Sequence, residues 1–128
     1  MKDLKINRTP KTPQIDFNLK TGILLIAGVS VPENSMEFYG SLINWVKDYV
    51  KGPLKETKVV FKLAYVNTSS LQFIYDFLML LDGINNQSSV VNIDWYYLEE
   101  DIDMKEMGED FREALGIEFS FYGVETVE

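Results

Sequence analysis

The sequence contains no cysteine and no histidine among its 128 residues. Without cysteine it has no disulfide, no thiolate nucleophile and no cysteine-ligated zinc. Without histidine it lacks the commonest general base, the commonest metal ligand and any Ser-His-Asp triad. Most side-chain arrangements on which enzymes depend are therefore excluded, and we expect a protein that is not an enzyme and that holds no metal or cofactor.

Positive charge is scarce, with 12 Lys and Arg against 20 Asp and Glu, a net charge of −8. The imbalance lies in residues 99–128, where 11 acidic side chains face only Lys105 and Arg112. A negative surface repels phosphate backbones and anionic lipid, so we expect neither nucleic acid nor membrane as a partner. The sequence also shows no apolar run of membrane-spanning length and no signal-peptide pattern, which favours the cytoplasm.

The first part of the chain predicts short strands. Leu4 to Phe17 contains Thr9-Pro10-Lys11-Thr12-Pro13, whose prolines hold their predecessors extended and donate no ladder hydrogen bond. This pattern indicates two edge strands joined by a stiff connection. Residues 14–18 and 23–28 flank a turn and predict a hairpin whose second arm is apolar on both faces.

The rest of the chain alternates between helical and strand periodicity. Asn34 with Glu37 predicts a capped helix start, and that helix runs to about Val50. Residues 57–66 predict a central strand covered on both sides, with Val59, Phe61, Leu63 and Tyr65 on one face. Further elements are expected as a helix from 67–70 to Ile84, a strand over 90–97, a helix with Met104, Met107, Phe111 and Leu115 on its core face, and a strand over 118–124.

This order predicts an α/β fold in a single domain spanning residues 1–128. A hairpin followed by strand–helix alternation makes a mixed sheet with an antiparallel N-terminal edge. The apolar stripe on each of the three expected helices covers one side only, so we expect the helices to pack mainly on one face of the sheet.

The segment Asn67-Thr68-Ser69-Ser70 combines three hydroxyls with a strand end and a helix start. Free amides and the positive end of the helix dipole make such a corner favourable for an anion. Ser and Thr at a helix start often serve only as caps, but one cap needs one hydroxyl and three are present. The spare hydroxyl is a candidate phosphoryl acceptor.

Two further features permit more than one interpretation. The run Glu99, Glu100, Asp101 and Asp103 lacks the central glycine and the spacing of an EF-hand loop, so it indicates either a solvated helix start or an acidic face that docks a basic partner. Tyr96 is expected to point away from the core. The rings of Phe38, Trp45 and Tyr49 lie off the main apolar stripe of the first helix, which indicates a deep core or a docking surface.

Four strings match one known family in order. They are Thr9-Pro10-Lys11-Thr12-Pro13-Gln14-Ile15-Asp16-Phe17, Ser30-Val31-Pro32-Glu33-Asn34 with Phe38 and Trp45, Tyr65-Val66-Asn67-Thr68-Ser69-Ser70, and Trp95-Tyr96-Tyr97 with Glu99-Glu100-Asp101 and Met104 to Gly108. With these strings the chain resembles, over essentially its whole length, the SiaC-type regulatory phosphoproteins of bacteria.

The resemblance implies a fold similar to the STAS domains of anti-sigma factor antagonists and a role in partner switching. It implies that a Ser/Thr kinase of the anti-sigma type phosphorylates Thr68 and that a PP2C-type phosphatase removes the phosphate. The unmodified form would bind and activate a target such as a diguanylate cyclase. Asn67, Ser69 and Ser70 would shape the corner, and candidate partner-binding residues are Glu33, Asn34, Tyr96, Glu99, Glu100 and Asp101.

The sequence departs from the family pattern at two positions. Gln72 stands where many members have lysine, and Val66 replaces a more usual aromatic residue. Loss of a cation one turn from the acceptor is expected to weaken phosphate stabilisation or to alter kinase docking. Two alternatives are a constitutive interaction module without phosphorylation and a metal-assisted hydrolase using Asp94, Glu99 or Asp101.

Overall fold

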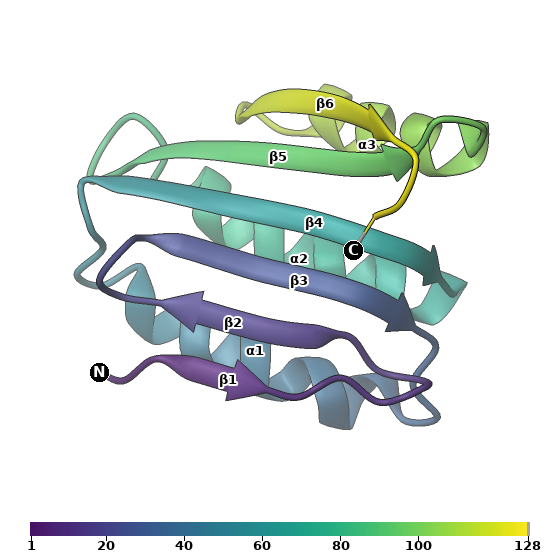
Figure 1. The fold of residues 1–128 in the computed structure, drawn as a ribbon. Helices are drawn as coiled ribbons and strands as arrows, with labels where there is room; N and C mark the ends of the chain where they lie inside the picture. The colour runs from purple at the N-terminus through teal and green to yellow at the C-terminus, as the bar shows by residue number, and fades with distance from the viewer. Residues whose placement is uncertain (128) are drawn as a thin grey trace.

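The computed structural model describes residues 1–127, which form one six-stranded sheet and three helices (Figure 1). The elements match those expected from periodicity to within a few residues at their ends. In chain order they are β1 (Leu4–Ile6), β2 (Gln14–Asn18), β3 (Ile23–Ser30), α1 (Ser35–Tyr49), β4 (Glu56–Val66), α2 (Thr68–Asp82), β5 (Val90–Leu98), α3 (Ile102–Ala114) and β6 (Glu118–Val124).

The strands lie in the sheet in the order in which they occur in the chain, from β1 to β6. β1, β2 and β3 pair antiparallel, and β3 to β6 pair parallel, because each later connection contains a helix. The predicted mixed sheet with an antiparallel N-terminal edge is therefore confirmed. Of the two expected edge strands only β1 is at the edge, since β2 lies between β1 and β3.

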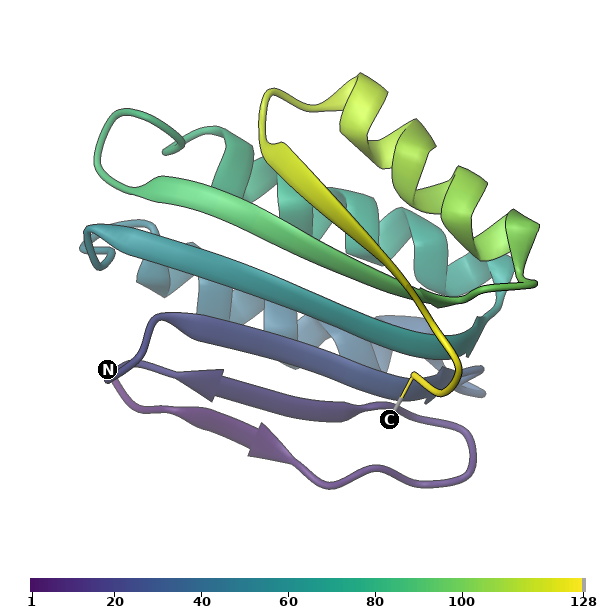
Figure 2. The ribbon, with the colours of Figure 1, turned by 45° about the horizontal axis from the view of Figure 1, so that its top comes forward.

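All three helices cover the same face of the sheet (Figures 1 and 2). Strands added in one direction through right-handed crossovers place every connecting helix on the same side. In β4 the side chains of Val59, Phe61 and Leu63 are buried beneath the helices, whereas Lys58 is exposed and Val60 is half-buried. The prediction that this strand is covered on both sides is therefore wrong, because no helix of residues 1–127 lies on the second face.

A bulge changes the direction of the side chains at the end of β4. Gly28 pairs with Leu63 while the next residue, Val29, pairs with Tyr65, so Ala64 is an extra residue in the ladder. An extra residue exchanges the two faces for everything beyond it. Tyr65, expected beside Leu63 on the core face, is instead 59% exposed, and Val66 points inward.

α1 contributes more aromatic side chains to the core than its main apolar stripe predicts. Its predicted cap is confirmed, since the Asn34 side chain accepts a hydrogen bond from Glu37 N. Trp45 and Tyr49 are buried and stack on each other with ring centroids 5.1 Å apart. These two rings therefore belong to the core, and Phe38 is half-buried beside it.

Within residues 1–127, no helix is long and apolar enough to span a membrane.

The parallel strands bring the three helix starts to one edge of the sheet. α1 follows β3, α2 follows β4 and α3 follows β5, so each helix begins where a strand ends (Figure 1). The cap residues Asn34, Asn67 and Asp101 stand at these junctions. We call this side of the molecule the carboxyl edge, and it holds the predicted switch-corner residues and all predicted partner-binding residues except Tyr96.

Candidate functional site

The corner between β4 and α2 is organised by Asn67. Its side-chain oxygen Oδ1 accepts hydrogen bonds from Ser70 N at 3.0 Å and Ser70 Oγ at 2.5 Å, and a longer one from Ser69 Oγ at 3.3 Å. The helix cap is thus the amide oxygen of Asn67. The expectation from the sequence, that one of the three hydroxyls serves as the cap, is wrong. All three hydroxyls of the segment are consequently spared from capping.

Ser70 uses its hydroxyl inside a buried relay. Ser30 Oγ donates to Ser70 Oγ at 2.9 Å and lies 2.5 Å from the hydroxyl of Tyr39, while Ser70 donates to Asn67. Burial raises the pKa of Tyr39, and its contacts with Ser30 and Ser70 offset part of that rise. Tyr39 therefore stays protonated at neutral pH and can donate to Ser30. The relay links α1, β3 and α2.

Thr68 differs from both serines of the corner. Ser69 Oγ lies 2.7 Å from Ser35 Oγ and ties the start of α2 to the start of α1. Thr68 is exposed, and its hydroxyl has no hydrogen-bond partner among the residues that the structure describes. Two of the three hydroxyls are thus committed to structure. The one left over is at the first position of α2, where free amides and the helix dipole favour an added anion.

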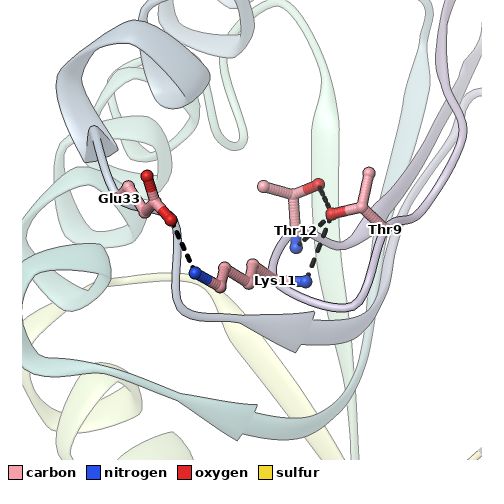
Figure 3. Close-up of polar contacts among 4 residues, drawn as sticks. All are labelled: Thr9, Lys11, Thr12 and Glu33. Atoms are coloured by element: carbon pink, nitrogen blue, oxygen red, sulfur yellow. Dashed lines mark hydrogen bonds and ion pairs between the residues drawn. The ribbon is translucent and has the colours of Figure 1, made fainter.

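The proline-rich loop contacts the segment that precedes α1, through Lys11 and Glu33 (Figure 3). Thr9 Oγ1 accepts from the backbone amides of Lys11 at 3.2 Å and Thr12 at 3.0 Å, which folds the loop into a turn. Lys11 Nζ then reaches Glu33 Oε1 at 2.6 Å, and this hydrogen bond lowers the pKa of the Glu33 carboxyl. The predicted partner-binding residue Glu33 is therefore already held by a lysine from the loop.

The backbone connects the loop to the corner in two steps. Val31 N donates to the carbonyl of Lys11 at 2.8 Å, and Asn67 N donates to the carbonyl of Ser30 at 2.9 Å. Neither the Thr9 turn nor the relay through Ser30 and Tyr39 was predicted from the sequence. A buried serine at a strand end cannot be recognised from periodicity, because serine also occurs commonly in ordinary turns at such positions.

At the start of α3, Asp101 is the cap and accepts from Met104 N at 3.0 Å. Glu99 and Glu100 are exposed in the preceding turn. Within residues 1–127 no three acidic side chains converge on a position that could hold a metal ion. Asp94, a residue of the hydrolase alternative, lies within 3.5 Å of Lys58 on the open face of the sheet and is apart from this turn. The three carboxylates of that alternative therefore form no common site.

Tyr96 is the one predicted partner-binding residue that lies away from the carboxyl edge. It points away from the core, as expected, and stacks on Tyr122 with ring centroids 4.8 Å apart. Lys62 Nζ lies 4.8 Å from the centre of the Tyr96 ring on the same face. Tyr96 thus belongs to the open face of the sheet and not to the carboxyl edge.

The two departures from the family pattern have clear structural roles. The Gln72 amide donates to Asp76 Oδ1 at 3.0 Å, so the position expected to carry a cation holds a neutral group directed along α2. Val66 is only 8% exposed and lies in the core. A phosphate at Thr68 would therefore depend on the helix amides more than on a lysine from the same helix.

We expect Tyr39→Phe to destabilise the protein by about 1–3 kcal/mol, because Ser30 and Ser70 lose a buried hydrogen-bond partner. The matched control is Tyr49→Phe, since the buried Tyr49 hydroxyl lies 2.6 Å from Thr57 Oγ1 at the opposite edge. Urea unfolding should show similar losses for both variants. Native-state hydrogen exchange of the Ser70 amide should accelerate only in Tyr39→Phe, and equal exchange in both would contradict a local role for the relay.

Known proteins share this fold and about one third of the sequence, at 32–33% identity. A family model described as "SiaC family regulatory phosphoprotein" matches residues 6–124. An uncharacterized protein of Pseudomonas aeruginosa (strain UCBPP-PA14) is 33% identical over 120 residues, covering 94% of this chain and 95% of that protein.

Solved structures agree with this match. Apo-SiaC from Pseudomonas aeruginosa is 32% identical with a TM-score of 0.87, over 96% of this chain and 100% of the other. A chain from the crystal structure of diguanylate cyclase SiaD in complex with its activator SiaC, from the same organism, superposes with a TM-score of 0.89 at 32% identity, over 95% of this chain and 100% of the other.

Proposed function

This chain belongs to the SiaC family of regulatory phosphoproteins, and from that membership we propose that it is the phosphorylation-controlled switch protein of a bacterial partner-switching system. The unmodified form binds and activates a target protein. A diguanylate cyclase is the best-supported target class, because the SiaC of Pseudomonas aeruginosa is the activator of diguanylate cyclase SiaD.

The proposed acceptor is Thr68. The observation that carries this assignment is its exposed hydroxyl, which has no partner within residues 1–127 while Ser69 and Ser70 are both hydrogen-bonded. A kinase needs a hydroxyl that it can reach and that no other contact holds. The proposed kinase is a Ser/Thr kinase of the anti-sigma type, and a PP2C-type phosphatase reverses the reaction. Since such a kinase uses ATP, we place the protein in the cytoplasm.

The effect of the modification follows from charge and position. A phosphate adds about −1.5 to −2 charges to the first turn of α2, where the helix dipole stabilises it by about 0.3–1 kcal/mol at an exposed site. The corner itself is held by Asn67 and the buried relay, so the phosphate changes the surface that a partner contacts and not the fold. In a close interface, the added charge opposes binding through desolvation and steric exclusion.

Intact-mass spectrometry of the protein isolated from its native cell tests the acceptor directly. We expect a population heavier by one phosphate, which Thr68→Ala abolishes and which treatment with a PP2C-type phosphatase removes. Ser69→Ala is the matched control and should retain the modification. If the protein carries no phosphate under any growth condition, the second candidate holds, namely a constitutive binding module in which the corner is only a helix start.

A further inference from the structure

A groove on the carboxyl edge lies next to the proposed phosphorylation corner. It runs between the end of β4 and the first turns of α3 and encloses about 240 Å³. Val66, which ends β4 and precedes the cap residue Asn67, forms part of its wall. The lining residues are Ala64, Tyr65, Val66, Asp101, Asp103, Met104 and Met107.

The groove exists because of the bulge at Ala64. The extra residue turns Tyr65 outward, so this ring stands on the rim and not beneath α3. Met104 is buried and Met107 half-buried, and both present flexible thioether side chains that adapt to different apolar shapes. Two apolar side chains are exposed here: Tyr65, which lines the groove, is 59% exposed, and Ile102, which lies between Asp101 and Asp103 in the sequence, is 64% exposed.

The size of the groove favours a side chain over a small molecule. Small-molecule sites usually enclose about 300–1,000 Å³ and surround most of the ligand. A volume of 240 Å³ is below that range, and the groove is open at the protein surface. One or two apolar side chains from a protein segment would fill it.

The negative charge around the groove indicates which residues should flank the inserted apolar side chains. Asp101 and Asp103 line the groove, and Glu99 and Glu100 precede it. None of these four carboxylates forms an ion pair with a cation in the described part of the chain. Like charges gathered on one rim are best neutralised by lysine or arginine from a partner.

We propose that this groove is the docking site for a partner segment that inserts an apolar side chain against Met104 and Met107, with flanking Lys or Arg facing Asp101 and Asp103. The inference rests on the proposed function in one respect, which is that the segment belongs to the target bound by the unmodified form. A segment seated beside Val66 would end close to Thr68, which is two residues further along the chain. Phosphorylation would then place a hydrated dianion where the partner must pack.

The test uses the methyl groups of the five methionines as reporters in ¹³C-methyl NMR of the full chain. The probe is a peptide, Gly-Arg-Leu-Leu-Arg-Gly, blocked at both ends. Burial of one or two leucines supports a dissociation constant on the order of 1 mM. We expect saturable shifts of the Met104 and Met107 methyls, whereas Met36 and Met79, which are exposed outside the groove, should not move.

Two controls isolate the contribution of charge. The same peptide with glutamate in place of arginine should shift neither groove methionine. Asp103→Lys should weaken binding of the arginine peptide at least about threefold, whereas Asp110→Lys, an equal charge change on the exposed side of α3, should leave it unchanged.

The groove assignment is overturned if the arginine peptide shifts all methionines alike, shifts none, or binds no better than the glutamate peptide. Because the unmodified recombinant protein is used, these results do not depend on phosphorylation. A negative peptide result would not affect the proposal that Thr68 is the phosphoryl acceptor. Conversely, a protein without phosphate in the native cell would not affect a positive peptide result.

Discussion

Replacing Thr68 with glutamate is expected to weaken binding of the proposed diguanylate cyclase target by about tenfold or more, a loss of about 1.4 kcal/mol or more. Thr68→Ala should bind as tightly as the wild type and resist the kinase. The reason is the position of the side chain, which is exposed on the carboxyl edge beside the groove. A carboxylate there must be dehydrated when a partner packs over it, and it adds to the acidic charge of Asp101 and Asp103.

Calorimetry with the proposed target cyclase provides the affinities, and production of cyclic di-GMP should fall in parallel. Thr21→Glu is the control, because it adds the same charge at an exposed position in the turn before β3, at the end of that strand opposite to the carboxyl edge. Thermal unfolding should be nearly unchanged in all variants. Equal binding by the wild type, Thr68→Ala and Thr68→Glu would contradict the switch, and equal weakening by Thr21→Glu would reduce the effect to net charge.

The largest effect on stability is expected from Trp95→Ala, at about 3–5 kcal/mol. Trp95 is completely buried between Phe61, at 5.0 Å between ring centroids, and Phe111, at 5.9 Å. Its indole N–H also donates to the carbonyl of Met104 at 2.9 Å, which fixes the first turn of α3. Removal of the ring leaves a cavity and takes away this hydrogen bond. The expected loss is a large share of the total stability of such a domain, which is about 5–15 kcal/mol.

Urea unfolding followed by circular dichroism measures this loss. The control is Tyr122→Ala, which removes an aromatic ring that is 41% exposed on the open face of the sheet and should cost less than about 1 kcal/mol. The close approach of Gly108, where an added Cβ would lie 2.7 Å from the indole, shows how little space surrounds Trp95. A loss below about 1 kcal/mol for Trp95→Ala would contradict this packing.

Much of the fold could be predicted from the sequence, because local patterns determine it. The hairpin turn, the Asn34 cap and the alternation of buried residues in Val59, Phe61 and Leu63 each act over a few residues. What periodicity could not predict was the bulge at Ala64, since one extra residue leaves no mark in composition. It also could not show that the second face of β4 is open, because half-buried Val60 and Ala64 resemble core residues in sequence.

The candidate site was predicted only in its local part. Asn67 to Ser70 stood out because four turn-forming residues follow a long strand. The different roles of the three hydroxyls depend on residues that are distant in sequence. Ser69 is hydrogen-bonded to Ser35, 34 positions away, and Ser70 is hydrogen-bonded to Ser30, 40 positions away. Contacts at such separation follow from tertiary packing and not from local propensity. The structure therefore identifies Thr68 as the unengaged hydroxyl, a distinction that spacing alone cannot make.

The match between strand order and chain order has a consequence for how the protein is made. Each strand pairs with the one synthesised just before it, so no strand has to wait for a later partner or be inserted between two others. The relay at the corner uses residues between Ser30 and Ser70 only. We therefore expect that, on the ribosome, β1 to α2 can assemble with the corner in place before the acidic residues 99–128 emerge, and that β5, α3 and β6 then add to an existing template.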